Sequence, residues 1–264
     1  MTPRTDDNLS PEPGFNPATR DDVDLFVVDL DAWAASRLDE SELPTADRLQ
    51  AARLREPAHA RRLLARRSAT RTILARRLGT DRGRLVISRL CPQCGATDHG
   101  KPFVSGTPIA FSVSSSGNLA VIAVAPSAVG VDVEIVGSKT RPESRAMSDR
   151  EQQSIASLSG ERRAIGFLRL WTAKEAVLKA AGRSLADDPS TVDVAELLWS
   201  ESSVVAEGRR RWHVRQIAVP DRPEGTVVVA LADDRGRPVS ERSPWSVGDA
   251  RSPSALFGKR PPST

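Results

Sequence analysis

The 264-residue chain contains no tyrosine, only two cysteines, and no stretch of about 18 consecutive apolar residues, the length that a membrane-spanning helix needs. Its N-terminus also lacks a basic patch followed by an apolar segment, so a secretory signal is not expected. Two cysteines, Cys91 and Cys94, are too few for a disulfide scaffold and fit a reducing compartment. We therefore expect a cytoplasmic protein without a membrane partner.

Both ends of the chain are poor in apolar residues. Residues 1–22 are rich in Pro, Asp and Thr, and residues 241–264 are dense in Ser, Pro and Arg, a composition typical of disordered segments. The rest divides by pattern into an N-terminal lobe at 23–127 and a C-terminal lobe at 128–240.

Charge is distributed unevenly along the chain. The first 50 residues are strongly acidic, whereas residues 51–90 contain 12 arginines against Glu56 and Asp81. Such a basic block indicates an anionic partner: nucleic acid, a phosphorylated small molecule or an acidic protein. Aromatic residues, which commonly stack on bases, are absent from the block, and this weakens the nucleic-acid interpretation.

Hydrophobic patterns predict an alternation of strands and helices. Helices are expected at 46–78 (interrupted near Pro57 and ending at Gly79), at 149–158 after Ser148, and at 161–181 before Gly182. Strands are expected at 24–29, 84–88, 108–113, 119–125, 131–136, 192–198, 211–218 and 226–231. The order suggests two similar α/β lobes.

The strand at 131–136 contains two acids. Side chains alternate across a strand, so Asp132 and Glu134 share one face and Val131 and Val133 the other. One interpretation is an amphipathic edge strand with a wet outer face. The other is a site for a hard cation such as Mg²⁺, which one or two carboxylates typically hold.

The helix at 161–181 places charged residues beside its apolar face. Phe167, Trp171 and Leu178 fall in one arc with Ala164, Glu175 lies at the edge of that arc, Lys174 flanks its other side and Lys179 lies one turn beyond Glu175. Buried charges need partners, which favours a functional role, but Glu175 and Lys179 could also form an ordinary surface pair.

In the arginine-rich helix, Arg67 and Arg71 fall within the same arc as Leu63, Leu64, Leu74 and Leu78, whereas Arg62, Arg66, Arg76 and Arg77 point elsewhere. Two interpretations of the inward pair stay open, phosphate capture and a structural salt bridge to an internal acid.

The loop CPQCGATDHGKPF follows at 91–103. Cys91 and Cys94 have the spacing of a zinc knuckle, and His99 could be a third ligand, but a closed zinc site normally has four ligands, so a reduced, turn-forming loop is preferred. Lys101, presented by a Gly-Lys-Pro turn, is a candidate phosphate contact.

Several motifs together resemble one known family. They are HGKPF at 99–103, FSVSSS at 111–116, GVDVE at 130–134 and WTAKEAVLKAAG at 171–182, with R-S-A-T-R at 67–71. The combination resembles the surfactin-type 4′-phosphopantetheinyl transferases. The resemblance implies an α+β fold of two pseudo-twofold-related α/β lobes, each a small antiparallel sheet packed on helices, with the active site in the cleft between them.

The resemblance also implies roles for individual residues. Asp132, Glu134 and Glu175 match metal ligands for Mg²⁺, with Mn²⁺ as an alternative, and Lys174 and Lys179 match lysines that hold coenzyme A phosphates. Lys101, Arg67, Arg71, Ser114 and Ser115 would also contact this co-substrate. Glu175, Lys179 and Asp132 would be catalytic, and the role of Glu151 is left open. The implied partner is an apo acyl or peptidyl carrier protein of polyketide or nonribosomal peptide biosynthesis, and the enzyme is expected to be a monomer.

One motif departs from the family. Its usual form is close to F-N-x-S-H-S, and here Ser112 replaces the asparagine and Ser115 the histidine. Serine donates a hydrogen bond but carries no charge, so altered coenzyme A binding is expected. The alternatives are a non-catalytic coenzyme A-binding homologue and a nucleic-acid-binding protein that uses the arginine-rich helix.

Overall fold

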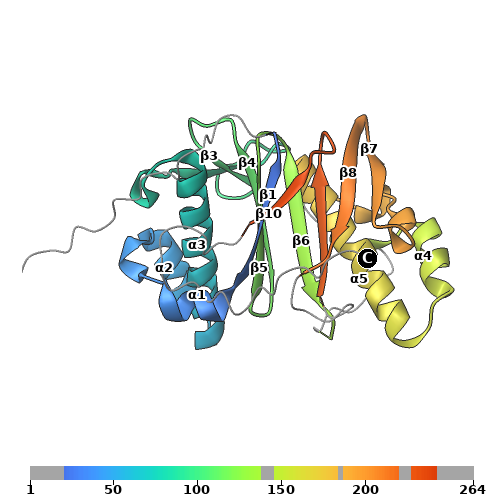
Figure 1. The fold of residues 1–264 in the computed structure, drawn as a ribbon, viewed down its shortest axis with the longest axis horizontal. Coiled ribbons are helices and arrows are strands. Elements are labelled where there is room, and N and C mark those ends of the chain that lie inside the picture. Colours follow the sequence, from blue (N-terminus) through green and yellow to red (C-terminus); the bar gives the residue numbers. More distant parts are fainter. Residues whose placement is uncertain (1–20, 138–145, 184–186, 220–226, 243–264) are drawn as a thin grey trace, which may run out of the picture.

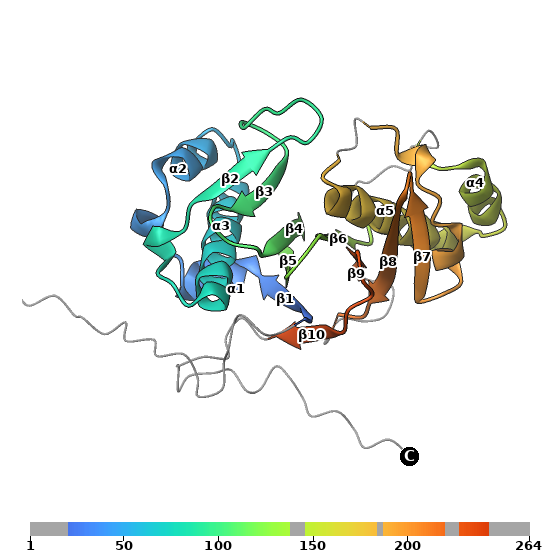
Figure 2. The same ribbon diagram turned by 90° about the horizontal axis from the view of Figure 1, so that it is seen from above.

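The computed structural model describes residues 21–137, 146–183, 187–219 and 227–242. It has four layers: helices, a sheet, a second sheet, and a long helix on the far side (Figure 1). Figure 2, seen from above, shows the two lobes side by side, with the strands β4 and β6 between them. The predicted α+β fold of small sheets packed on helices is confirmed.

The elements follow one another in two groups. The first comprises β1 (Val23–Asp29), α1 (Leu30–Ser36), α2 (Thr45–Ala52), α3 (Pro57–Leu78), β2 (Ile87–Leu90), β3 (Lys101–Val104), β4 (Ala110–Ser116) and β5 (Leu119–Ala125). The second comprises β6 (Val129–Ile135), α4 (Asp149–Ala156), α5 (Gly160–Ala181), β7 (Ser202–Glu207), β8 (Arg210–Ile217), β9 (Val227–Asp233) and β10 (Val239–Arg242).

Each lobe contains a four-stranded sheet. The first has the order β10-β1-β5-β4, the second has the order β6-β9-β8-β7, and β2 and β3 form a separate hairpin. All pairings are antiparallel except that of β1 with β10. The last described strand therefore joins the N-terminal sheet, so the predicted boundary of the C-terminal lobe at 240 does not separate the two sheets.

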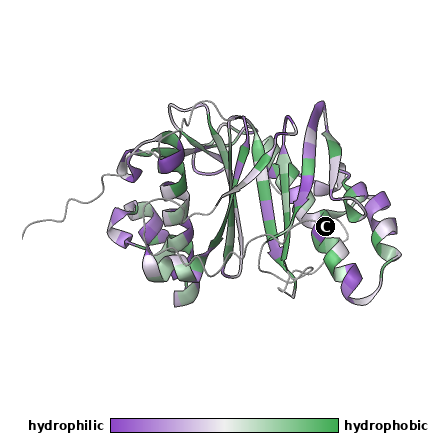
Figure 3. Cartoon of the chain, viewed as in Figure 1, coloured by the Kyte–Doolittle hydropathy of each residue, from purple (hydrophilic) through white to green (hydrophobic). Residues whose placement is uncertain are grey.

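Three apolar clusters fill the spaces between the layers. The first packs α1 and α3 onto the first sheet around Trp33. The second lies between the two sheets and includes Val121 and Val131, and the third surrounds α5 and includes Leu178 and Trp212. Figure 3 shows the hydrophobic residues concentrated on the central strands. None of the helices in the described ranges combines the length and the apolar character needed to span a bilayer.

Helix ends were the best predicted features of the fold. Pro57 begins α3, and the left-handed residues Gly79 and Gly182 follow α3 and α5, as the sequence predicted. Ser148 caps α4 in a reciprocal capping box with Glu151.

Other local predictions were wrong. Residues 192–198 do not form a strand: a short 3₁₀ turn at 195–198 follows another at 189–191, and residues 192–194 connect the two. The elements α1, β3, β7 and β10 were not predicted. Of the terminal segments predicted to be disordered, 1–20 and 243–264 lie outside the described residues, whereas residues 21 and 22 precede β1 and residues 241 and 242 belong to β10.

Helix α5 is buried on most of its sides, not along the single face that periodicity predicted. One side packs on β6, where Gly130 permits a very close approach: a Cβ at this position would lie 1.9 Å from the carbonyl oxygen of Ala176. The glycine that opens the GVDVE motif is therefore required by packing, because any side chain would push α5 away from the strand that carries Asp132.

Candidate active site

The two sheets meet along β4 and β6, which are edge strands of different sheets. Serine side chains of β4 connect them. The Ser112 hydroxyl accepts a hydrogen bond from the Val131 backbone N–H at 3.1 Å, and the Ser116 hydroxyl accepts one from that of Ile135 at 3.2 Å. Ser112, in the position of the family's asparagine, thus joins the two strands.

The same face of β4 contacts both acids of β6. Ser114 donates a hydrogen bond to Asp132 Oδ1 at 2.6 Å, and Ser116 donates one to Glu134 Oε2 at 2.9 Å. The two carboxylates therefore point to one side of β6, as strand alternation predicted. That side faces α5 and the edge strand β4, whereas Val131 and Val133 face the space between the two sheets, so it is not a solvated outer face.

Helix α5 adds an acid and a base to this group. Lys179 Nζ lies 2.5 Å from Asp132 Oδ1, 3.2 Å from Ser114 Oγ and 3.9 Å from Glu175 Oε2. The Glu175 side chain is only 12% exposed. Asp132, Glu175, Lys179 and Ser114, which come from three elements, thus form one polar cluster.

The carboxylates of this cluster repel one another in a desolvated place. Burial, together with the nearby charges of Asp132 and Glu134, raises the pKa of Glu175 to about 7, although the Lys179 ammonium acts in the opposite direction. Asp132 Oδ2 is buried and makes no hydrogen bond to the described residues. A bound cation would give the Asp132 oxygen a partner and would reduce the repulsion between the carboxylates that raises the pKa of Glu175.

Ligand atoms of Asp132, Glu134 and Glu175 do not all lie within 4.8 Å of one another; among the residues described, only Cys91, Cys94 and His99 satisfy that limit. Lys179 extends between Asp132 and Glu175 instead. The donor set and its charge fit a divalent ion, and a shared ion would need the carboxylates to move closer together.

The raised pKa of Glu175 predicts a pH-dependent loss of stability in metal-free protein. Below about pH 4.5, Glu175 is protonated in both the folded and unfolded states. Between about 4.5 and 7 the unfolded state loses the proton first, so this residue makes folding less favourable as pH rises, and above about 7 the penalty is complete. Glu175→Gln stays neutral, and we expect it to be more stable than wild type by about 1–3 kcal/mol at pH 8.

Urea denaturation in EDTA at pH 4.5, 6 and 8 measures this difference in the free energy of unfolding. Glu161→Gln, an exposed substitution in the first turn of the same helix, serves as the control and should show no such trend. A Glu175→Gln difference that does not change with pH would contradict the assigned environment.

A large cleft adjoins the cluster. It has a volume of about 1280 Å³ and extends from Lys179 and Gly182, at the end of α5, to α2, α3 and the β2–β3 hairpin. Its lining contains one acid, Asp47, and seven lysines and arginines: Arg66, Arg67, Arg71, Arg89, Lys101, Lys179 and Arg183. The excess of positive charge suits a ligand that carries several phosphates.

Two of these arginines were missed as site residues by the sequence analysis. Arg66 was expected to point outward into solvent, but it lines the cleft and donates a hydrogen bond to Ser115 Oγ at 2.8 Å. Arg89 donates to the Gly100 carbonyl at 3.1 Å. Burial lowers the pKa of both guanidinium groups, with Arg67 repelling each of them. The region therefore concentrates positive charge, and Asp47 is the one acid among the described residues that line the cleft.

Three other predicted contacts to the co-substrate have protein partners in this structure. Arg67 lies 3.6 Å from Asp47, and Arg71 donates to the carbonyls of Arg82 and Leu85. The Lys101 ammonium donates to the carbonyls of Val129 (3.2 Å) and Ala180 (2.8 Å), and burial lowers its pKa to about 8. All three line the cleft, but each would have to exchange or share a protein contact to bind phosphate.

Another arginine of α3 differs from the prediction. Arg77, expected to be solvated, is 4% exposed and lies 3.0 Å from Asp24 of β1, whereas Arg62 lies on the surface, as predicted, and pairs with Asp31. Together with Arg67 and Arg82, these arginines pair with acids of the N-terminal region, which leaves less free charge for nucleic acid than the sequence suggested.

Lys174 does not lie in the cleft, and its predicted contact with a coenzyme A phosphate does not fit the structure. The side chain is fully buried, 2.7 Å from Glu151, and donates to the carbonyls of Pro189 and Val192. Glu151 is also fully buried and accepts from the Val194 N–H at 2.8 Å. The pair connects α4, α5 and the 189–194 segment, which gives Glu151 a structural role.

Comparisons with known proteins all point to one family. A model of the 4′-phosphopantetheinyl transferase superfamily matches residues 128–232, which include Asp132, Glu134, Glu175 and Lys179. The 4′-phosphopantetheinyl transferase HetI of a Nostoc species is 31% identical over 185 residues, covering 67% of this chain and 75% of HetI. The 4′-phosphopantetheinyl transferase AcpT of Salmonella typhi is 34% identical over 110 residues, covering 39% of this chain and 57% of AcpT. A 4′-phosphopantetheinyl transferase of Bacillus subtilis is 30% identical over 97 residues, covering 34% of this chain and 42% of that protein.

Proposed function

Because this chain belongs to the 4′-phosphopantetheinyl transferase superfamily, we propose that it transfers the phosphopantetheine arm of coenzyme A to a serine of an apo carrier protein. The serine oxygen would form the new phosphoester bond, and the phosphoanhydride would break to release adenosine 3′,5′-bisphosphate. The observation that carries the proposal is the cluster of Asp132, Glu175 and Lys179 at the end of a cleft lined by basic residues.

Asp132, Glu134 and Glu175 are the residues that we propose hold Mg²⁺, with Mn²⁺ as a substitute. When bound, the ion would supply positive charge to the pyrophosphate and help to orient it. The free oxygen of Asp132 and the repulsion that raises the pKa of Glu175 support this assignment.

The protein residues would act by placing charge and moving a proton. Lys179, 30% exposed at the end of the cleft, is positioned to neutralise negative charge as the phosphoanhydride breaks. Glu175, directly or through water, would accept the proton of the carrier serine. Ser114, which bonds both Asp132 and Lys179, would hold these two groups in place.

The nucleotide end of coenzyme A would occupy the basic part of the cleft. Its 3′-phosphate is a dianion that needs more than one charged partner, and Arg66 and Arg89 are two cleft arginines that lack a carboxylate ion pair among the described residues. Ser115, in the position of the family's histidine, bonds Arg66 directly. The charge that the serine lacks would therefore come from Arg66.

This assignment predicts a substrate-dependent effect. In Arg66→Ala and Arg89→Ala, we expect the KM for coenzyme A to rise about 10- to 100-fold, because a charge-assisted hydrogen bond contributes roughly 1.5–3 kcal/mol. Dephospho-coenzyme A lacks the 3′-phosphate. If Arg66 and Arg89 bind that phosphate, the KM for dephospho-coenzyme A should rise less than about twofold in these variants.

Steady-state kinetics with both co-substrates provides the measurement. Arg62, on the same helix as Arg66, forms a surface ion pair with Asp31 of α1; Arg62→Ala is the matched control and should leave both KM values unchanged. An equal rise for both co-substrates in Arg66→Ala would show that the arginine does not recognise the 3′-phosphate.

A direct assay tests the activity itself. The full chain is incubated with Mg²⁺, coenzyme A and a panel of apo carriers, including acyl and peptidyl carriers of polyketide and nonribosomal peptide pathways, and each carrier is analysed by mass spectrometry. We expect the mass gain of one phosphopantetheinyl group on at least one carrier. Measurable coenzyme A binding without transfer to any carrier would favour a non-catalytic homologue.

A further inference from the structure

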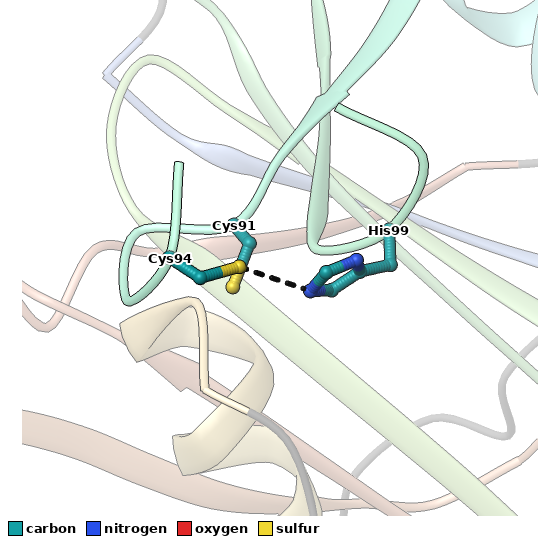
Figure 4. Close-up of side chains that lie close together, drawn as sticks. All are labelled: Cys91, Cys94 and His99. Carbon is teal, nitrogen blue, oxygen red and sulfur yellow. Dashed lines mark hydrogen bonds between the residues drawn. The ribbon is translucent and has the colours of Figure 1, made fainter. Parts of the chain in front are cut away.

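A second group of ligating side chains lies outside the carboxylate cluster, in the loop between β2 and β3. Figure 4 shows Cys91, Cys94 and His99 directed toward one another. One ligand atom from each of the three lies within 4.8 Å of the other two. Both cysteines are free thiols; Cys91 is buried and Cys94 is exposed.

The spacing of the ligand atoms suits a tetrahedral ion. Cys94 Sγ lies 3.4 Å from His99 Nε2. With Zn–S near 2.3 Å and Zn–N near 2.0–2.1 Å, a tetrahedral angle places a sulfur and a nitrogen about 3.6 Å apart. The observed separation is therefore close to the one that two ligands of a single zinc ion require.

The backbone holds the cysteines in a compact turn. The Gly95 N–H donates to the Cys91 carbonyl at 2.9 Å, and the Cys91 N–H donates to the Ala96 carbonyl at 2.8 Å. Gly95, with φ of 73°, permits the left-handed conformation that closes the turn. Backbone hydrogen bonds and the left-handed glycine therefore hold both cysteines in one turn.

A second glycine brings the histidine to the turn. Gly100 has φ of 94°, and a Cβ there would lie 2.4 Å from the Leu90 carbonyl oxygen and 2.5 Å from Cys91 Cα. Only a glycine permits this contact between the two ends of the loop, which places His99 beside Cys91.

The histidine ring is also oriented. His99 Nδ1 lies 2.7 Å from Asp98 Oδ1, while Nε2 faces Cys94. A carboxylate that accepts the N–H of one ring nitrogen leaves the other nitrogen with a free lone pair, as in carboxylate–histidine–zinc arrangements.

We propose that Cys91, Cys94 and His99 bind one zinc ion through two thiolates and the Nε2 atom of the histidine. No fourth His, Cys, Asp or Glu of the described residues joins this group, so water or a ligand in the adjoining cleft would complete the coordination shell. This inference is independent of the proposed transfer reaction.

The site would stiffen the edge of the cleft where the lobes meet. The Gln93 side chain donates a hydrogen bond to Asp187, which lies beyond the end of α5. Pro92 lies close to Gly182: a Cβ built on Gly182 would be 3.2 Å from the Pro92 ring. Cys91 and His99 themselves line the cleft. Zinc would thus fix a loop of the N-terminal lobe against the C-terminal end of α5.

Metal analysis of the full chain tests the proposal. Protein purified with a phosphine reductant is stripped with a chelator, and Zn²⁺ or Co²⁺ is then added back. We expect one equivalent of zinc by elemental analysis. With Co²⁺ we expect the visible bands of a tetrahedral ion and the near-ultraviolet charge-transfer band of cobalt–thiolate bonds.

Variants assign the ligands. Cys94→Ser changes an exposed residue and should weaken the thiolate band and lower zinc affinity, as should His99→Gln, while Asp98→Asn should lower zinc affinity roughly 10-fold. His59→Gln, an exposed histidine on α3, is the control and should bind zinc like wild type. Circular dichroism melts establish that each variant is folded.

Three results would overturn the proposal. They are failure of the reduced, metal-free protein to take up zinc, a cobalt spectrum without a thiolate band, and unchanged zinc binding in folded Cys94→Ser.

Discussion

Asp132→Asn and Glu175→Gln are each expected to lower phosphopantetheinyl transfer by at least roughly 100-fold, the scale on which loss of one preorganised electrostatic group affects catalysis. Both substitutions keep the size of the side chain and remove its charge. Asp132→Asn removes the ion pair with Lys179 at 2.5 Å and a proposed ligand of the cation. Glu175→Gln removes the carboxylate that we propose accepts the proton of the carrier serine. Transfer rates to a saturating apo carrier, measured by mass spectrometry over a Mg²⁺ titration, give the result.

The stability of these variants separates catalysis from folding. Glu175→Gln should be inactive although more stable than wild type at pH 8, so unfolding cannot explain its lost activity. Glu161→Gln, at the exposed start of the same helix, should retain wild-type transfer. If both Asp132→Asn and Glu175→Gln keep more than about half of the activity, an effect far below the expected one, the assigned cluster is not the reaction centre.

Glu151→Ala is expected to destabilise the protein by about 3–5 kcal/mol, the scale on which removal of one partner of a buried ion pair acts. Its removal would leave the fully buried Lys174 ammonium without its carboxylate, and the Val194 N–H without an acceptor. Chemical denaturation at pH 7 measures the change in the free energy of unfolding. Glu196→Ala, at an exposed ion pair with Arg150, is the matched control and should cost less than about 1 kcal/mol.

A double variant distinguishes a structural role for Lys174 from the co-substrate contact that the sequence suggested. Glu151→Leu with Lys174→Met removes both charges and should be more stable than Glu151→Ala alone, because no uncompensated charge remains. We expect the KM for coenzyme A in this double variant to stay within about twofold of wild type, less than the loss of one charge-assisted bond would cause. A large rise in that KM in the folded double variant would restore Lys174 to the binding site.

Features with local causes could be predicted from the sequence. Proline and glycine marked ends of the long helices α3 and α5, serine marked the start of the short helix α4, and alternation placed Asp132 and Glu134 on one side of a strand. Strand β5 at Leu119–Ala125 was predicted with its observed bounds, because an unbroken apolar run between turn residues has few other interpretations.

Features set by distant contacts could not be predicted. Periodicity places Lys174 and Glu175 on opposite sides of the apolar arc of α5, but only the packing of residues 189–194 over one side buries Lys174 and leaves Glu175 near the cleft. Arg66 and Arg77 likewise appeared to be solvated because their partners, Ser115 and Asp24, are distant in sequence. No local signal distinguishes these arginines from exposed ones.

The parallel pairing of β10 with β1 has a consequence for how the chain folds during synthesis. Val23 of β1, among the first described residues, pairs with Val239 of β10, among the last. Until the ribosome has released residues 239–242, β1 keeps an edge with unpaired amides and carbonyls, which can pair with other chains. A nascent or truncated chain that ends before residue 239 would therefore be prone to aggregate, and completion of the N-terminal sheet would occur only after the C-terminal lobe has emerged.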